Sequence, residues 1–351
     1  MGVLRLVAQF TNMPAPFTPA WWLPGPHLQT IWGRMFRRTP LPPVTTAVWP
    51  TDDGDQVTVV RLAPASPNAP RILFLHGLEG TSRSHYVRGF YKEAAARGWG
   101  VDLLLFRTCD GKLNSTRRTY HSGETSDPAM ALHRVIESAG NAPVALVGVS
   151  LGGNVLLRLL AMLDHRVERR ICAAVAVSTP YDLARSCAHL RQGSSRIYQW
   201  FFVRQLQRKA LAKAAQFPGL AEPEAIARAR TLWEFDDAFT SIVHGFRDAA
   251  DYYAKCSSID VLDDIRVPTL LLSSRDDPFH PRELLDDVAA RAAKNPALTL
   301  EFLEFGGHVG FIGGSPFRPR YYAEWRVAEF IAEKCRARNN SIDQQRSTPA
   351  R

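Results

Sequence analysis

The chain has 351 residues, of which 46% are hydrophobic and 22% are charged, a balance typical of globular proteins with a sizeable core. This length suits one large α/β domain with an insertion, or two smaller domains. The formal net charge of +9 leaves transient contact with an anionic membrane surface open. No DNA- or RNA-binding motif accompanies the basic residues, so we expect no nucleic-acid partner.

Targeting and redox signals are weak. Residues 1–10 make a poor signal peptide, and no run of about 18 apolar residues occurs, so we expect no transmembrane helix. The cysteines are odd in number and show no C-x-x-C spacing, which favours reduced, mostly buried thiols in a cytoplasmic protein. They are Cys109, Cys172, Cys187, Cys256 and Cys335.

The first 50 residues are rich in proline and tryptophan and are predicted to form an arm, extended between residues 11 and 50, that packs its aromatic side chains on the main domain. A hairpin turn at residues 52–55 follows. Short apolar runs, predicted as buried strands, then alternate with helices, which predicts a parallel sheet covered on both faces. The strands are expected at residues 57–63, 71–75, 101–106, 144–147 and 171–177, and the helices at 86–97 and 127–139.

The alternation stops between residues 181 and 262, where the sequence is helical, basic and aromatic. We interpret this segment as a helical cap or lid inserted into a core formed by residues 51–180 and 263–335. The core resumes with strands at 269–272 and 298–305 and helices at 281–293 and 320–334. Residues 336–351 are polar and are expected to be a disordered tail. The cap aromatics either line an acyl pocket or pack cap against core: Tyr198, Trp200, Phe201 and Phe202.

The pentapeptide Gly148-Val149-Ser150-Leu151-Gly152 lies between an apolar strand and a helical run. This G-x-S-x-G pattern is typical of a nucleophile elbow, the sharp strand-to-helix turn of α/β-hydrolases. Small flanking residues are needed because the turn brings strand and helix close together. The pattern predicts that Ser150 is a catalytic nucleophile; a Gly-rich turn of a nucleotide-binding unit is the alternative.

A serine nucleophile needs a base and an acid that orients the base, and in α/β-hydrolases these follow in the order Ser, Asp, His. Asp276 and Asp277 both follow the strand at residues 269–272, and we prefer Asp277 because it heads a D-x-x-x-P pattern. His308 is the predicted base, since it follows the last strand in a glycine-rich loop. The other aspartate is expected to bond the loop backbone.

An oxyanion hole needs two backbone donors. Leu151 N–H, directly after the nucleophile, is one candidate, and Leu78 N–H, in the loop after the strand at residues 71–75, is the other. Residues 117–125 are polar and either line the cleft or anchor a loop. His121 and Glu124 in this segment resemble metal ligands in type, but they lack partners, so we expect no metal and no cofactor.

Together these motifs resemble the YheT-like branch of the α/β-hydrolases, whose animal members act on phospholipids or other esters and carry an N-terminal membrane anchor. We recognise no such anchor in this sequence and therefore expect no stable membrane attachment. The resemblance covers about residues 20–335. It implies a mostly parallel eight-stranded sheet flanked by helices, a Ser150–Asp277–His308 charge relay and carboxylic ester hydrolysis. The matching stretches are residues 26–32, 76–80, 120–125, 148–154, 276–279 and 306–311.

We therefore predict a serine esterase for a small ester substrate with short to medium acyl groups. Two alternatives stay open: an amidase, aminopeptidase or acyltransferase with the same three residues, and a non-catalytic lipid-binding protein on a hydrolase scaffold. The sequence does not indicate the oligomeric state.

Overall fold

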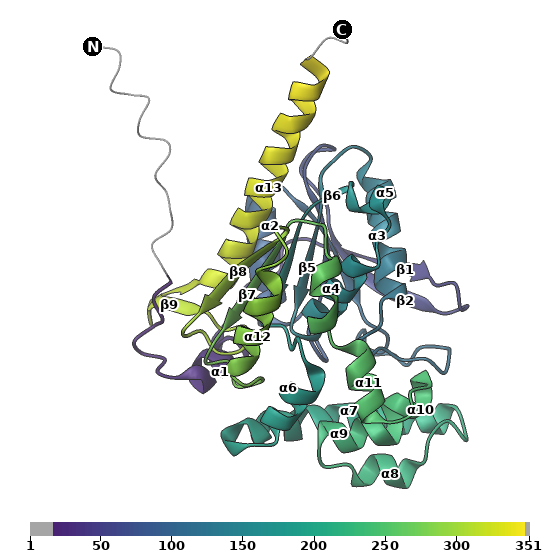
Figure 1. The fold of residues 1–351 in the computed structure, drawn as a ribbon. Coiled ribbons are helices and arrows are strands. Elements are labelled where there is room, and N and C mark those ends of the chain that lie inside the picture. Colours follow the sequence, from purple (N-terminus) through teal and green to yellow (C-terminus); the bar gives the residue numbers. More distant parts are fainter. Residues whose placement is uncertain (1–16, 348–351) are drawn as a thin grey trace.

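The computed structural model describes residues 17–347, and a single eight-stranded sheet forms its centre (Figure 1). The strand order is β1-β2-β4-β3-β5-β6-β7-β8. β2 pairs antiparallel with β1 and with β4, and all other neighbours are parallel, which confirms the predicted fold class. The strands are β1 (Thr45–Pro50), β2 (Gln56–Leu62), β3 (Arg71–Leu75), β4 (Gly100–Leu105), β5 (Val144–Val149), β6 (Ile171–Val177), β7 (Thr269–Ser274) and β8 (Leu298–Leu303).

Helices cover both faces of the sheet, because the central strands are apolar on both sides (Figure 1). Within β3, Ile72 and Phe74 belong to the core beneath α2 and α13, whereas Leu73 and Leu75 belong to the core beneath α3, α4 and α12. Alternate residues of one strand thus supply two cores. The covering helices are α2 (His85–Ala96) and α13 (Tyr322–Ser347) on one face, and α3 (Ser126–Ala139), α4 (Leu151–Ala161) and α12 (Glu283–Ala292) on the other.

The segment between β6 and β7 is helical, and its helices lie together beside the body of the sheet, shown in teal and green at the bottom of Figure 1. It has apolar clusters of its own, one of them around Ile226, Phe235 and Phe239. We call this segment the helical insertion. Its elements are α6 (Leu183–Leu190), η1 (Gly193–Ser195), α7 (Arg196–Gln216), α8 (Pro223–Arg228), α9 (Leu232–Phe235), η2 (Asp236–Thr240), α10 (Ser241–His244), α11 (Ala249–Cys256) and η3 (Ile259–Asp264).

Several elements of the structure were not expected, among them β1. The expected extended arm contains a helix, α1 (Pro26–Phe36), which begins with a proline at its first turn, where the missing N–H costs nothing. A short α5 (His165–Glu168) and a hairpin of β9 (Ile312–Ser315) and β10 (Arg318–Tyr321) were not expected. Finally, α13 continues to Ser347, through most of the expected disordered tail, and no glycine or proline interrupts it there. Residues 1–16 and 348–351 lie outside the described residues.

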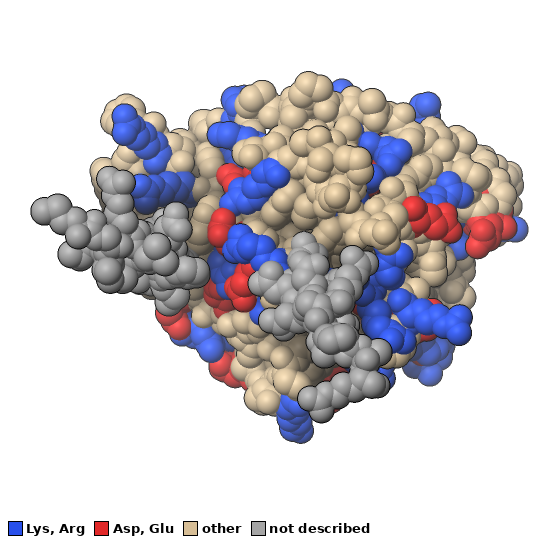
Figure 2. All heavy atoms as spheres, turned by 90° about the horizontal axis from the view of Figure 1, so that it is seen from above, with Lys and Arg blue, Asp and Glu red and all other residues tan. Residues whose placement is uncertain are grey.

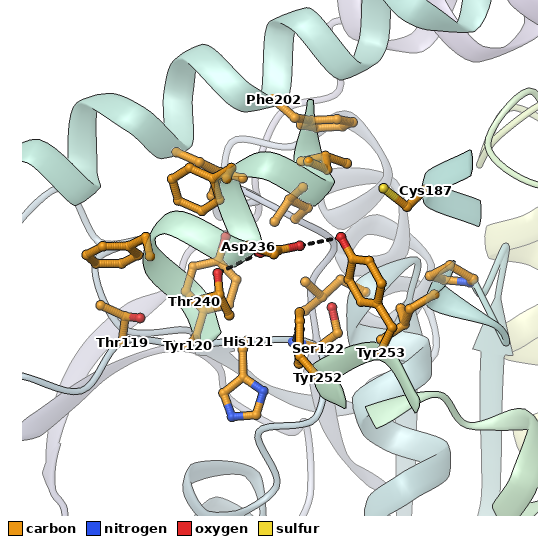
Figure 3. A pocket seen from close by; sticks show the side chains of 18 of the residues that line it. Thr119, Tyr120, His121, Ser122, Cys187, Phe202, Asp236, Thr240, Tyr252 and Tyr253 are labelled. Atoms are coloured by element: carbon orange, nitrogen blue, oxygen red, sulfur yellow. Dashed lines mark hydrogen bonds between the residues drawn. The ribbon is translucent and has the colours of Figure 1, made fainter. Parts of the chain in front are cut away.

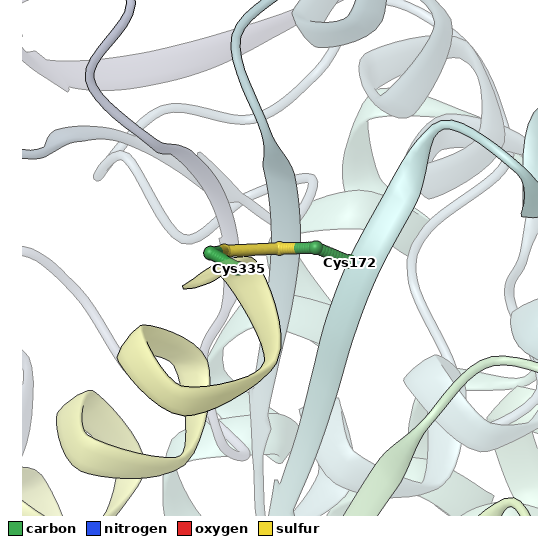
Figure 4. Close-up of a disulfide and its surroundings, with 2 residues drawn as sticks. All are labelled: Cys172 and Cys335. Atoms are coloured by element: carbon green, nitrogen blue, oxygen red, sulfur yellow. A yellow bond between two sulfur atoms is a disulfide. The ribbon is translucent and has the colours of Figure 1, made fainter. Parts of the chain in front are cut away.

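The cysteine prediction is wrong for one pair. Cys172 of β6 and Cys335 of α13 form a disulfide, with Cα atoms 5.3 Å apart (Figure 4). Their 163-residue separation gives no local signal, since the pairing depends on how α13 packs over the sheet. The other three cysteines are buried free thiols, as expected. The inference of a reducing, cytoplasmic environment loses part of its support, because disulfides are rare there.

Across the described residues, no helix combines the length and the hydropathy that a membrane span requires. Figure 2 shows one face of the molecule, on which Lys and Arg side chains are dispersed, with acidic side chains among many of them. The positive net charge is therefore spread over this face rather than gathered in one block.

Candidate active site

Ser150 lies at the turn where β5 ends and α4 begins. Its backbone has φ 54° and ψ −122°, a conformation that L-residues rarely adopt and that is often found at functional sites. The glycines around Ser150 are required because a Cβ at these positions would clash with neighbouring backbone atoms. A Cβ on Gly148 would lie 2.3 Å from the Gly152 carbonyl oxygen, and a Cβ on Gly152 would lie 2.3 Å from that of Leu75. The turn therefore has the geometry of the predicted elbow.

His308 and Asp277 meet Ser150 from loops at the ends of neighbouring strands. The His308 Nε2 atom lies 3.0 Å from Ser150 Oγ, and its Nδ1 lies 2.8 Å from one Asp277 oxygen and 3.1 Å from the other. Asp277 is only 3% exposed. Burial alone would raise its pKa, but His308 and His280 and the bonds from His308 and Phe279 N–H hold the pKa below its usual value. The carboxylate is thus held ionised against the imidazole.

The neighbouring Asp276 faces elsewhere. Its Oδ1 accepts a hydrogen bond from the Gly307 N–H at 2.9 Å, and burial raises its pKa. Asp276 therefore fixes the backbone of the loop that carries His308, while Asp277 contacts the imidazole. The choice of Asp277 over Asp276 as the triad acid stays a prediction, which this geometry favours.

The loop after β3 passes close to the nucleophile, since a Cβ on Gly77 would lie 3.1 Å from the Ser150 Cβ. Gly77 N–H donates to the Tyr86 hydroxyl and Glu79 N–H to the Tyr120 hydroxyl, but Leu78 N–H has no acceptor among the described residues. Leu151 N–H opens α4 and likewise has no helical acceptor. Both predicted oxyanion donors are therefore available to a ligand beside Ser150.

Two polar segments noticed in the sequence hold these loops. In the segment at residues 26–32, Thr30 Oγ1 accepts from His308 N–H at 2.9 Å, and the Gln29 side chain bonds the backbone of Ile312. In the segment at residues 120–125, the Tyr120 hydroxyl donates to Glu79 at 2.7 Å. Of the two roles considered for that segment, loop anchoring is thus observed at Tyr120, and cavity lining is observed at Tyr120, His121 and Ser122.

A cavity of about 140 Å³ lies between Ser150 and the helical insertion, and Figure 3 shows side chains that line it. We call it the closed cavity because helices of the insertion form much of its wall. Among its polar lining residues is Asp236, whose carboxylate accepts hydrogen bonds from the hydroxyls of Thr240 and Tyr253, each at 2.6 Å. Burial raises the pKa of Asp236 to about 6. The apolar side chains that dominate the lining include Leu183, Leu190, Phe202, Leu206, Phe235 and Phe239.

An open cleft of about 830 Å³ reaches Ser150 from another side. His308 borders this cleft but not the closed cavity, and Phe202 and Phe279 border both. Of the four cap aromatics considered from the sequence, Phe202 alone lines the closed cavity, whereas Tyr198, Trp200 and Phe201 line the cleft.

Phe279 was not recognised as a site residue. Its ring stacks on His308, with centroids 3.7 Å apart and planes at 8°. Its position two residues after Asp277 is the one signal that the sequence offered. The stacked ring fixes the plane of the imidazole, and Phe279 lines both cavities.

The residues considered as metal ligands do not gather a ligand set. His121 Nε2 lies 3.9 Å from Glu124, and burial lowers the pKa of His121 to about 4. Within residues 17–347, no group of three or more His, Cys, Asp or Glu side chains is arranged to hold a metal ion.

The comparison with known families agrees with this fold. A family model described as "Alpha/beta hydrolase family" matches residues 72–325. The chain belongs to the α/β-hydrolase family. This α/β-hydrolase is 37% identical over 335 residues to a protein of Escherichia coli K12 named "Putative esterase YheT", covering 93% of this chain and 95% of that one. The resemblance to the YheT-like branch is thereby confirmed.

Matches to more distant relatives extend over about three quarters of this chain. The human protein named Phospholipase ABHD3 is 27% identical over 263 residues, 75% of this chain and 63% of its own length. A Saccharomyces cerevisiae protein named Monoacylglycerol lipase is 29% identical over 266 residues, 73% of this chain and 57% of its own. The solved structure of the Pyrococcus furiosus esterase Pf2001 has a TM-score of 0.53 at 16% identity, covers 83% of this chain and 92% of that one, and supports the fold alone.

Proposed function

We propose that this α/β-hydrolase is a serine esterase that cleaves carboxylic esters through an acyl-enzyme. The observation that carries the proposal is the hydrogen-bonded chain from Ser150 Oγ through His308 to the buried Asp277 carboxylate. The printed names of its relatives, an esterase, a phospholipase and a lipase, support the same class of reaction.

In the proposed reaction, His308 takes the proton of Ser150 as Oγ attacks the ester carbonyl, and Asp277 stabilises the imidazolium. The N–H groups of Leu78 and Leu151 hold the oxyanion, and each is expected to contribute about 100- to 1,000-fold in rate. His308 then protonates the departing alcohol. Water, deprotonated by the same imidazole, attacks the acyl group and releases Ser150 with the carboxylic acid.

The closed cavity supports a short to medium acyl group, because apolar side chains dominate its lining and the helical insertion forms its far wall. We propose this range, a small ester substrate and a cytoplasmic location as parts of the same hypothesis.

A parallel assay tests the bond that is cleaved. The protein would be given p-nitrophenyl esters of two to twelve acyl carbons and, separately, an amino-acyl p-nitroanilide. We expect turnover of the esters with a maximum at short or medium length, and little turnover of the anilide. A kcat/KM for the anilide equal to or above that of the best ester would contradict the proposal and favour an amidase.

A further inference from the structure

The two cavities that meet at Ser150 differ in their relation to the proposed base. If the proposed function holds, His308 must protonate the leaving alcohol, so the alcohol part of the ester has to depart on the side where the imidazole is exposed. His308 borders the open cleft and not the closed cavity. The acyl group therefore belongs in the closed cavity and the alcohol in the cleft.

The cleft is lined by arginines. Its lining includes Arg34, Arg37, Arg38, Arg83 and Arg88. The acidic side chain among its lining residues, Glu79, is already neutralised, since one of its oxygens lies 2.7 Å from Lys209 Nζ and the other accepts from the Tyr120 hydroxyl. The charge facing the cleft is thus positive.

Most of these arginines are not neutralised by the protein. Arg37 forms an ion pair with Glu324. The other four have no carboxylate at ion-pair distance within the part of the chain that the structure describes. Arg34, Arg38 and Arg83 are exposed, and Arg88, half-buried, has an Nε without an acceptor among the described residues.

Positive charge also acts on a titratable side chain of the cleft, after the larger influence of burial. His85 lies in its lining, and burial together with Arg37 and Arg34 lowers the pKa of His85 to about 3. Aromatic walls accompany the charges: the guanidinium of Arg34 lies over the Phe201 ring at 4.5 Å, and Trp200 is 57% exposed. A concave surface lined by one sign of charge concentrates ligands of the opposite sign.

We propose that the cleft binds an anionic group, a phosphate or a carboxylate, on the alcohol part of the ester, while the acyl chain occupies the closed cavity. Guanidinium groups bind both anions through paired N–H donors. The proposal rests on the proposed function for the direction of the substrate, but the anion site itself can be measured without catalysis.

Binding of ether analogues, which an esterase does not cleave, tests the site directly. Titration calorimetry at low salt would compare 1-O-octylglycerol 3-phosphate with uncharged 1-O-octylglycerol on the parent protein, with the 3-O-carboxymethyl ether as the carboxylate arm and inorganic phosphate alone as a competitor. We expect the phosphate analogue to bind about tenfold more tightly than the neutral one or better. Equal affinity for the charged and neutral analogues would overturn the proposal.

A charge-matched pair of variants locates the site. The triple variant Arg34→Gln/Arg38→Gln/Arg83→Gln is expected to lose the preference for the anionic analogues. The control Arg117→Gln/Arg166→Gln/Arg208→Gln removes the same charge from exposed arginines outside both cavities and should keep it. Loss of the preference in both triple variants would attribute it to net charge and contradict a built site.

Hydrolysis of the corresponding octanoyl esters separates this inference from the proposed function. If the phosphate ether binds and neither ester is cleaved, the result supports the anion site and contradicts the proposed esterase activity. If both esters are cleaved with equal kcat/KM and the charged and neutral ethers bind equally, the result supports the esterase activity and contradicts the anion site.

Discussion

The strand ends and the helical insertion make different contributions to the same site. The strand ends supply Ser150, Asp277 and His308, which come from distant parts of the sequence and are held by loops with several backbone bonds each. The insertion supplies the far wall of the closed cavity through side chains such as Leu206 and Phe235, which make van der Waals contacts only. Substitutions at the strand ends should therefore alter the rate of the chemical step, and substitutions in the insertion should alter which acyl group the cavity accepts.

The largest effect is expected at the nucleophile. Ser150→Ala should lower kcat for a p-nitrophenyl ester on the order of 10⁴- to 10⁶-fold, because no other group can form the acyl-enzyme. The thermal midpoint should change little, since the substitution removes a single oxygen atom. An initial-rate assay beside a thermal melt checks both. Substantial turnover by a folded Ser150→Ala protein would place the chemistry elsewhere.

The two aspartates form a matched pair for the next test. Asp277→Asn should reduce kcat by about 10⁴-fold, because an amide cannot hold the imidazole in the required tautomer or stabilise its charge. Asp276→Asn, one residue away, should keep most of the activity, since its Oδ1 contacts a backbone N–H and not the imidazole. If the two variants lose activity equally, Asp277 has no special role.

A smaller, selective effect is expected in the insertion. Leu206→Trp should fill part of the closed cavity and lower kcat/KM for octanoyl esters by about tenfold, while acetyl esters are affected little. Arg208→Trp places the same side chain on the exposed side of α7 and serves as the control. The test is a profile of kcat/KM against acyl length for both variants. If Leu206→Trp lowers kcat/KM equally for all acyl lengths, the cavity does not hold the acyl chain.

The smallest effect concerns Asp236, whose pKa of about 6 exceeds its ordinary value of 3.8. The folded state then binds a proton that the unfolded state releases, so this group's contribution to stability is present below about pH 4 and is lost as pH rises to about 6. Asp236→Asn should flatten the dependence of the free energy of unfolding over that window, measured by urea titration. An unchanged slope would mean that Asp236 titrates normally.

The sequence indicated the sheet and three candidate site residues at its edge, because each of them is marked by a local pattern. Each of Ser150, Asp277 and His308 follows an apolar run that marks a strand, and parallel strands bring their carboxyl ends to one edge. The motif at residues 26–32 indicated that the N-terminal segment belongs to the family pattern. It did not indicate the hydrogen bond between Thr30 and His308, because that contact joins residues 278 positions apart.

What the sequence could not indicate depends on packing between distant segments. The disulfide joins residues 163 positions apart, and the arginine-lined cleft combines side chains of α1, the loop before α2 and α7. None of these arginines lies in a motif. The ring of Phe279 is one aromatic residue among many until its stacking on His308 is seen.

Labelling with a fluorophosphonate probe tests the central claim, an activated Ser150, most directly. The parent protein and His308→Ala would be treated, digested and mapped by mass spectrometry, with circular dichroism to verify folding. The account predicts a phosphonylated Ser150 in the parent and a strong loss of labelling in His308→Ala. A folded parent protein that stays unlabelled at Ser150, or labelling that is independent of His308, would contradict it.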